Sequence, residues 1–306
     1  MIVYRELSSL ALDLGFSAKA LYSVSNCTEK HYHKVQIPKA NGEFRELLVP
    51  DAFLKSIQHS IVTKLLAYEE LSPYATAYRY GTSTIANARN HRSQPVILKL
   101  DIRHFFNHIT YPLVKEKVFP SERYSEKNRI LLSILCVHTH TVPQGAPTSP
   151  AISNIIMRDF DNLVGQWCSS RSIVYTRYCD DMTFSGDFDV QETIRFATSE
   201  LQKLGFYLNE KKTRVIRDGQ RKSVTGIVVT EKLSVPVSYR RRVRQEIYYC
   251  RKYGVASHLK EKGIQVSEKT YLLRLLGRVN YVLSVEKSEE MLGYYEWLQS
   301  TLENYR

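Results

Sequence analysis

The stretch 172–186, SIVYTRYCDDMTFSG, decides the fold of this chain. β-branched and aromatic residues lie on both sides of the acidic pair Asp180-Asp181, so the stretch predicts two antiparallel strands joined by a tight turn. The flanking segments alternate in type: a strand at 95–102 (PVILKLDI), helices at 149–167 and 191–206, and a strand at 223–229. This order predicts the α+β class, with a small antiparallel sheet backed by helices in the split βαβ arrangement.

The remaining elements are predicted from periodicity, turn residues and helix caps. Asn41-Gly42 between two apolar runs is a strong hairpin signal, and Asp51 is suited to cap a helix. From Pro236 onward the chain is expected to be mainly helical and basic. The other expected elements are a helix over 5–25, a hairpin over 33–50, a helix from 51 to about 70, and a helix over 124–138.

The charge balance points to a polyanionic partner. The 306 residues include 43 Lys and Arg against 31 Asp and Glu, a formal charge of +12, and a field of that sign favours nucleic acid or an anionic membrane. Membrane is the weaker interpretation, because no apolar run approaches the ~20 residues that span a bilayer. The N-terminus lacks a signal-peptide pattern, and the five cysteines show no zinc-ligand spacing. We therefore expect a cytoplasmic protein without a membrane partner.

Two acidic clusters stand at the ends of apolar strands. Asp101 follows VILKL, and Asp180-Asp181 lie at the turn of YTRYCDDMTFS. An isolated Asp at such a place is usually a turn or cap residue, but adjacent carboxylates repel each other unless a cation joins them. Magnesium prefers oxygen ligands and shares them with substrate phosphates. The pattern therefore predicts a Mg²⁺ site, with a pair of ions that activate a hydroxyl and stabilise a leaving pyrophosphate.

Four strings, in this order, resemble the motifs of reverse transcriptases. LKLDIRHFF at 98–106 resembles the first catalytic motif, and VPQGAPTSPAISN at 142–154 resembles the motif beneath the templating base. YCDD at 178–181 resembles the Y-x-D-D box, and GFYLNEKKT at 205–213 resembles the motif that carries a lysine near the triphosphate. The resemblance implies catalytic roles for Asp101, Asp180, Asp181 and, by motif register, Lys212 in preference to Lys211, and a metal set of the three aspartates with Ile102.

Two further strings resemble retron enzymes in particular. NARNH at 87–91 matches an Asn-Ala-x-x-His pattern, and SVTGIVV at 223–229 contains Val-Thr-Gly; the opening through IPKANGEFRELLVP is also similar. The resemblance implies a right-hand polymerase fold with fingers, a split-βαβ (ferredoxin-like) palm and a helical thumb. The expected domains are 1–95 for N-terminal helices and fingers, 96–230 for the palm with a fingers insertion at about 111–140, and 231–306 for the basic thumb.

The resemblance also implies an activity and its partners. The product would be a small single-stranded DNA, copied from a cognate structured non-coding RNA with dNTPs and Mg²⁺, and primed from an RNA 2′-hydroxyl. Retron enzymes stay bound to this product and act with an effector protein in anti-phage defence. Two alternatives stay open: another bacterial reverse transcriptase, of group II intron or abortive-infection type, and a non-catalytic module that binds RNA or the DNA product and neutralises an effector.

The resemblance assigns nucleotide-binding roles to residues outside the acidic clusters. Lys39 and Arg45, on either side of the hairpin turn, would hold the triphosphate, for which the planar guanidinium is suited; a solvated hairpin is the alternative. Phe106 would exclude a ribose 2′-hydroxyl, while strand alternation would send Phe105 into the core. Gln144 and Gly145 would approach the nascent base pair, where glycine permits close backbone contact.

RNA-binding residues are predicted in the retron-like strings and the thumb. Asn87 and His91 are four apart, so a helix would project them from one face, and with Val224, Thr225 and Gly226 they would select the cognate RNA. The alternative is that Asn87 and His91 are hydrogen-bonded struts. In YRRRVRQEIYYCRK at 239–252, a helix would bury Val243, Ile247 and Cys250 and present a basic face to phosphates. Its predicted RNA-binding residues are Arg240, Arg241 and Arg244, with Arg251 on the same face as Arg240 and Arg244.

Overall fold

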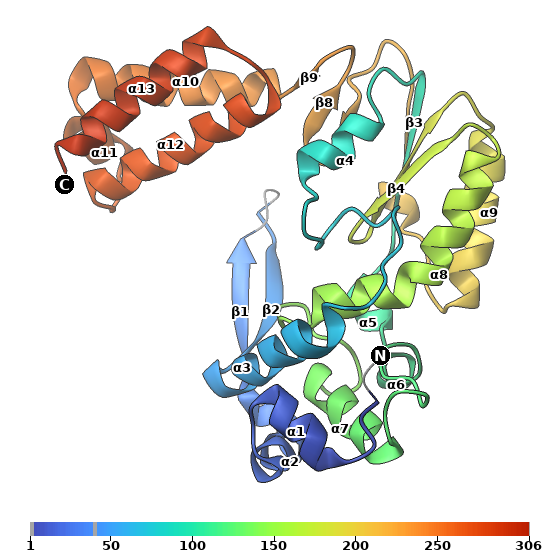
Figure 1. Cartoon of the computed structure of the whole chain (residues 1–306). Helices are drawn as coiled ribbons and strands as arrows, with labels where there is room; N and C mark the ends of the chain where they lie inside the picture. The colour runs from blue at the N-terminus through green and yellow to red at the C-terminus, as the bar shows by residue number, and fades with distance from the viewer. Residues whose placement is uncertain (1–2, 39–41, 306) are drawn as a thin grey trace. The chain divides into compact units, whose positions relative to one another are not determined.

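The computed structural model describes residues 3–38 and 42–305, which divide into two compact units (Figure 1). The first unit comprises Met1–Thr82, Leu98–Phe184 and Phe188–Val215. The second comprises Ser83–Ile97, Ser185–Asp187 and Ile216–Arg306. In the described part of the chain, no helix is both long enough and apolar enough to cross a bilayer.

The N-terminal segment forms two short helices. The single helix expected over 5–25 is wrong: α1 (Leu7–Leu14) ends at Gly15, whose φ of 76° is left-handed, and α2 (Ala18–Ser25) begins after Ser17. The Ser17 side chain accepts a hydrogen bond from the Ala20 amide, as an N-cap does. The 3₁₀ turn η1 (Thr28–His31) then leads into the first strand.

The expected hairpin and its following helix are confirmed. Strands β1 (Tyr32–Pro38) and β2 (Phe44–Pro50) pair antiparallel with Val35 opposite Leu47. Asp51 caps α3 (Ala52–Ile61) by accepting a hydrogen bond from the Leu54 amide, and one π-helical turn, η2 (Val62–Leu66), continues it. The hairpin turn at Asn41 lies outside the described residues.

A four-stranded sheet in the order β4-β5-β3-β6 forms the centre of the predicted βαβ arrangement. Helix α8 packs on β4, and α9 packs on α8 through the stacked rings of Trp167 and Phe196, whose centroids are 4.3 Å apart. This confirms the α+β class and the element order predicted around the acidic turn (Figure 1). The bounds are β3 (Val96–Asp101), β4 (Val174–Tyr178), β5 (Asp181–Gly186), β6 (Arg214–Ile216), α8 (Ser149–Ser169) and α9 (Val190–Lys203).

Further short helices belong to the first unit, and α7 packs on α1, α2, α3 and α6. The helix expected over 124–138 is observed as α7. A single 3₁₀ turn, η3, carries the two lysines of the GFYLNEKKT string. The bounds are α5 (Phe105–His108), α6 (Tyr111–Lys117), α7 (Glu126–Cys136) and η3 (Glu210–Lys212).

The second unit contains a small sheet and a helical bundle. The single strand expected over 223–229 is wrong, because Thr225 and Gly226 have positive φ angles of 46° and 82° and turn the chain between β7 (Ser223–Val224) and β8 (Ile227–Val229). Strand β9 (Leu233–Ser234) pairs with β8, and α4 (Thr84–Asn90) packs on β7 and β8. The expected helical C-terminal region is confirmed as α10 (Val237–Tyr253), α11 (Val255–Lys262), α12 (Glu268–Val285) and α13 (Glu289–Glu303).

Candidate active site

Three carboxylates meet where neighbouring strands end. Asp101 is the last residue of β3, Asp180 lies in the turn between β4 and β5, and Asp181 begins β5, which lies next to β3 in the sheet. The amide of Ile102 donates a 2.9 Å hydrogen bond to the carbonyl oxygen of Asp180, which fixes the two strand ends against each other. Asp101 is only 6% exposed. The fold therefore brings together the two acidic clusters that lie about eighty residues apart in the sequence.

Lys212 joins the carboxylates from η3. Its ammonium donates to Asp101 Oδ2 at 2.7 Å, and this hydrogen bond raises the pKa of Lys212. The pKa of Asp181 is raised to about 6, first by burial and then by the negative charges of Asp180 and Asp101. Lys99 and Lys212 act in the opposite direction on this pKa, but they do not cancel the effect of burial and of the two neighbouring carboxylates.

A divalent cation fits the donors of this cluster. Magnesium takes carboxylate oxygens, keeps several waters and completes its shell with substrate phosphates. Burial, followed by the charges of Asp180 and Asp101, raises the pKa of Asp181, and a bound cation would favour its ionised form. Within residues 3–38 and 42–305, no three acidic, His or Cys side chains are arranged to hold a metal by themselves. Waters and substrate phosphates would supply the remaining ligands of such a cation.

A cavity of about 430 Å³ opens over the carboxylates. Asp101, Asp180 and Lys212 line it together with Arg45 of β2, Phe106 of α5 and Gln144. These residues come from five of the strings singled out in the sequence, so the structure gathers most of the predicted nucleotide site in one place. Lys39, predicted to act with Arg45, lies outside the described residues.

The two phenylalanines of the first string differ in exposure. Phe105 is buried against Phe206, with ring centroids 5.6 Å apart, whereas Phe106 is partly exposed at the cavity. The strand alternation expected to separate them is wrong: both residues belong to helix α5, which follows a left-handed His104 with φ of 47°. Phe106 nevertheless lies in the cavity beside Asp101, where the predicted sugar contact requires a ring.

Gln144 and Gly145 hold the hairpin strand β2 against the cavity. The Leu48 amide donates to the Gln144 carbonyl oxygen at 2.9 Å. Gly145 has φ of 130°, and a Cβ atom there would lie 2.7 Å from the Leu48 carbonyl oxygen. Glycine is therefore required twice over, for the backbone conformation and for the close approach of β2.

The catalytic turn has supports that the sequence analysis missed. Cys179 adopts a left-handed conformation with φ of 61°, and the Tyr78 hydroxyl donates to its sulfur at 3.3 Å. The carbonyl oxygen of Cys179 accepts a hydrogen bond from Arg177, which is fully buried. An arginine inside an otherwise β-forming strand was the available signal, because a buried charge requires a partner.

The two retron-like strings lie side by side in the second unit. Asn87 and His91 are buried, and His91 Nδ1 forms a 2.7 Å hydrogen bond with the Ser185 hydroxyl. Val224 is buried in the cluster that contains Ala88 of α4, and the Thr225 hydroxyl donates to the Thr84 carbonyl oxygen at 2.8 Å. Asn87 and His91 thus occupy the interior, the placement that the strut alternative describes, and RNA contact by these strings stays a prediction.

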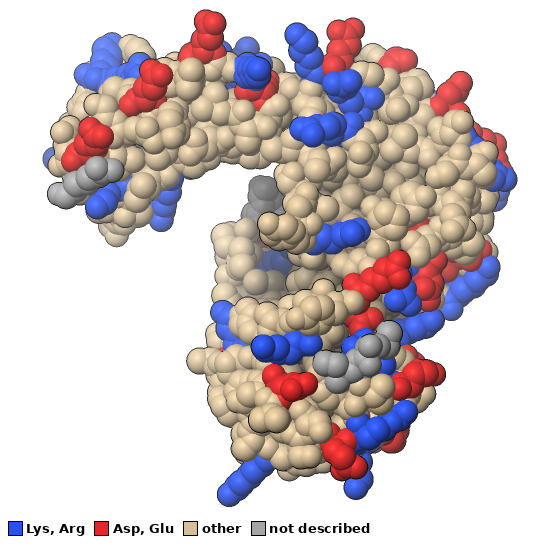
Figure 2. All heavy atoms as spheres, viewed as in Figure 1, with Lys and Arg blue, Asp and Glu red and all other residues tan. Residues whose placement is uncertain are grey.

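The basic face of α10 is partly neutralised. Arg240 pairs with Glu286 at 3.0 Å, Arg244 pairs with Glu290, and the Arg251 guanidinium stacks over Tyr294 and Trp297 of α13. The sequence run does not reveal these partners, and contact of this face with phosphates stays a prediction. Arg241 is exposed. Figure 2 shows Lys and Arg alternating with Asp and Glu over the helical bundle on the visible face.

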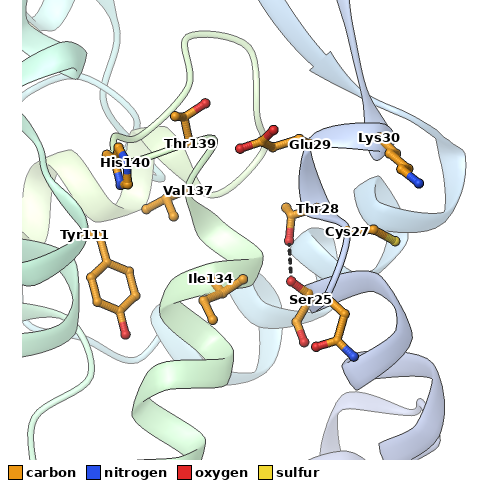
Figure 3. Close-up of a pocket in the computed structure, with 11 residues that line it drawn as sticks. Ser25, Cys27, Thr28, Glu29, Lys30, Tyr111, Ile134, Val137, Thr139 and His140 are labelled. Carbon is orange, nitrogen blue, oxygen red and sulfur yellow. Dashed lines mark hydrogen bonds between the residues drawn. The ribbon is translucent and has the colours of Figure 1, made fainter.

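A second cavity, of about 650 Å³, lies away from the carboxylates (Figure 3). Residues 25–30 line one side, and Tyr111, Val137, Thr139 and His140 face them. Thr28 hydrogen-bonds within its own turn, to the Ser25 carbonyl oxygen at 3.1 Å. None of the predicted site residues borders this cavity, so the smaller acidic cavity is the candidate active site.

The chain is similar to proteins of known type. Residues 37–294 match the sequence profile of the family described as reverse transcriptase (RNA-dependent DNA polymerase). The retron Mx65 reverse transcriptase of Myxococcus xanthus is 33% identical over 272 residues, or 80% of this chain and 63% of that protein. The retron Ec83 enzyme of Escherichia coli is 35% identical over 196 residues, covering 61% of this chain and 59% of that one.

A third relative is matched along more of its length. The retron Ec86 reverse transcriptase of Escherichia coli is 28% identical over 269 residues, which cover 84% of this chain and 82% of that protein. In the other two matches, the chain spans 63% and 59% of the relative's length.

Proposed function

This chain belongs to the reverse transcriptase family, and from that premise we propose that it is a retron-type enzyme that synthesises DNA on an RNA template. One observation carries the proposal: Asp101, Asp180 and Asp181 meet at adjacent strand ends, and Asp101 and Asp180 line a cavity together with Arg45 and Phe106. The right-hand polymerase fold follows from the family. Within it, we assign 1–95 to N-terminal helices and fingers, 96–230 to the palm, and 231–306 to the thumb.

The residues around the cavity have distinct proposed tasks. Arg45, with Lys39, would bind the triphosphate of the incoming nucleotide, because a guanidinium contacts two phosphate oxygens at once. Phe106 would contact C2′ of the sugar and exclude a 2′-hydroxyl. Lys212, released from Asp101, would donate a proton to the leaving pyrophosphate or stabilise its charge. Gln144 and Gly145 would keep β2, and therefore Arg45, at the correct distance from the base pair.

We propose that the metal is magnesium, bound as two ions by Asp101, Asp180, Asp181 and the backbone at Ile102. Bound there, the ions would activate the primer hydroxyl and neutralise the triphosphate. The three neighbouring carboxylates of the cluster and the preference of Mg²⁺ for carboxylate and phosphate oxygens support this assignment.

The retron assignment specifies the template and the partners. We propose a cognate structured non-coding RNA, a 2′-hydroxyl primer on that RNA, and a small single-stranded DNA that stays bound to the enzyme. The similarity to the Mx65, Ec83 and Ec86 retron enzymes supports this assignment. A role in anti-phage defence with an effector protein is proposed from the retron resemblance alone.

We infer that Asn87 and His91 serve RNA binding indirectly. Their side chains are buried where α4 packs on the β7–β8 hairpin, so they would shape this small module while exposed residues contact the RNA.

Primer extension tests the enzymatic proposal. The purified chain would be given a primed RNA template, dNTPs and Mg²⁺, with Asp180→Asn as the control. We expect DNA from the wild type and none from the variant, since the substitution removes a metal-ligand charge without changing the core. A wild type that binds the template but adds no dNTP with either Mg²⁺ or Mn²⁺ would instead favour the non-catalytic binding alternative.

A separate experiment tests the retron assignment. The chain would be expressed with the genomic DNA that precedes its reading frame, and nucleic acid would be extracted from the purified protein. We expect a discrete single-stranded DNA that shortens after RNase and changes mobility after treatment with a 2′,5′-debranching enzyme. DNA that lacks any RNA linkage would contradict 2′-hydroxyl priming but would leave the polymerase assignment intact.

A further inference from the structure

A charged pair is completely buried behind the catalytic turn. Arg177 lies on β4 and Asp161 on α8, and both are 0% exposed. Removing two charges from water is costly, and an apolar pair of similar volume is often as stable. Burial of an ion pair behind the turn therefore does not by itself explain why charged residues, rather than apolar ones, occupy these two positions.

The Arg177 guanidinium is hydrogen-bonded in three directions. Nε and Nη2 donate to the two carboxylate oxygens of Asp161, at 2.8 and 2.6 Å. Nη2 also donates to Asn154 Oδ1 at 3.2 Å, and Nη1 donates to the carbonyl oxygen of Cys179 at 2.8 Å. Asp161 and Asn154, both on α8, thus fix the plane of the guanidinium, and its remaining arm holds the backbone of the catalytic turn.

The hydrogen bond from Arg177 to the Cys179 carbonyl oxygen is made to a residue with a strained backbone conformation. Cys179 has φ of 61°, a conformation that residues with a Cβ rarely adopt. Its carbonyl belongs to the peptide group that supplies the amide of Asp180. The next peptide group is also held, because the Asp180 carbonyl oxygen accepts the Ile102 amide at 2.9 Å. Both peptide groups that flank the Cα of Asp180 are therefore fixed, one by Arg177 and one by the residue that follows Asp101.

We propose that Arg177 is a positioning residue, which, anchored by Asp161 and Asn154, holds the left-handed turn so that Asp180 and Asp181 face Asp101 in the geometry that binds divalent cations. The inference rests on the proposed function and deepens it. Arg177 contacts no substrate; it acts through the backbone. A lysine could keep the charge beside Asp161, but its single ammonium lacks the planar fork that reaches both Asp161 and Cys179.

Two single substitutions separate positioning from stability. Arg177→Lys removes the fork, while Tyr175→Phe removes only the 2.8 Å hydrogen bond from the Tyr175 hydroxyl to Asp161 and leaves the bond to Cys179 intact. Mn²⁺ binding to the full chain, followed by electron paramagnetic resonance, would be measured beside thermal unfolding. We expect Arg177→Lys to weaken Mn²⁺ binding by about tenfold to a hundredfold, as loss of an outer support of a metal site does. Tyr175→Phe should stay within about twofold of the wild type.

Kinetics provide a second readout. Arg177→Lys should raise the Mg²⁺ concentration that gives half-maximal DNA synthesis, and excess Mg²⁺ should restore part of the rate. If Arg177→Lys does not fold, the double variant Arg177→Met with Asp161→Leu, which removes both charges, takes its place under the same criteria. Wild-type Mn²⁺ affinity in the variant, or losses in both single variants that simply follow their thermal destabilisation, would overturn the proposal.

The outcomes also separate this inference from the proposed function. A wild type that synthesises no DNA would remove the enzymatic proposal, while the Mn²⁺ comparison would still test the positioning role. A wild type that synthesises DNA, with variants that bind Mn²⁺ normally, would keep the enzyme and remove the role of Arg177. A wild type that fails to bind Mn²⁺ would overturn the positioning role as well, because there would be no cation site to position.

Discussion

Substitution of Gly145 by alanine should damage the nucleotide site through the backbone of β2. The added Cβ would lie 2.7 Å from the Leu48 carbonyl oxygen, a distance at which one of the two segments has to move. The φ of 130° is itself unfavourable for alanine, which costs about 1–3 kcal/mol. Loss of the hydrogen bond from the Leu48 amide to the Gln144 carbonyl adds about 1 kcal/mol. We therefore expect a total destabilisation of about 3 kcal/mol.

The functional effect should be larger than the loss of stability suggests. Leu48 is three residues from Arg45 on the same strand, so a displaced β2 carries the triphosphate-binding side chain with it. A displacement of this kind reduces kcat/KM for dNTP by up to about a hundredfold. Single-nucleotide incorporation and thermal unfolding would be measured together.

Gly15→Ala is the matched control. Gly15 has a positive φ of 76°, but a Cβ added to it would meet no atom within 4 Å, so this change has a backbone cost of about 1–2 kcal/mol without a steric one. Its incorporation kinetics should stay those of the wild type. Equal thermal and kinetic behaviour of the two variants would refute the argument from close approach.

Three further outcomes are expected. Phe106→Ala should admit ribonucleotides, as measured by single rNTP against dNTP addition, whereas unchanged discrimination would place the sugar contact elsewhere. Asp181→Asn should raise the unfolding temperature of the metal-free chain at pH 8 and much less at pH 4. The folded-state pKa is raised to about 6 from an ordinary 3.8, so the cost of ionising Asp181 in the folded state builds up between these two values and is complete only above them. His91→Ala should lose the bond to Ser185 and destabilise the chain by about 1–3 kcal/mol, with the ratio of cognate to scrambled RNA affinity unchanged; a selective loss of cognate binding at normal stability would show that His91 contacts RNA.

The core of the candidate site could be predicted because short segments carry it. Each aspartate of the candidate site lies next to a run of β-forming residues, and the sheet order brings the end of β3 beside the start of β5. Interruptions within a predicted helix or strand were harder to predict. Gly15 ends α1 although the apolar periodicity of the sequence continues past it. Thr225 lies in a turn between two strands, although β-branched residues seldom adopt a positive φ.

Partners that are distant in sequence could not be predicted. The ion pair between Arg177 and Asp161 joins a strand to a helix, and the ion pair between Arg240 and Glu286 joins residues 46 positions apart in the helical bundle. The charge run at 239–252 therefore suggested more unpaired positive charge than the helix presents. Burial of Asn87 and His91 is likewise set by packing of α4 on a hairpin more than a hundred residues away.

The ion pair between Lys212 and Asp101 has a consequence for how the site fills. Under the proposed function, a cation that binds Asp101 would compete with an ammonium group that lies 2.7 Å from Asp101 Oδ2, so part of the metal's binding free energy would be spent on this competition. The same competition would free the lysine for the triphosphate that arrives with the metal. Removing the charge of Lys212 would thus raise the affinity for the metal and lower the rate of pyrophosphate release. Affinity for the metal and turnover would in that sense oppose each other, with the Lys212 side chain setting the balance between them.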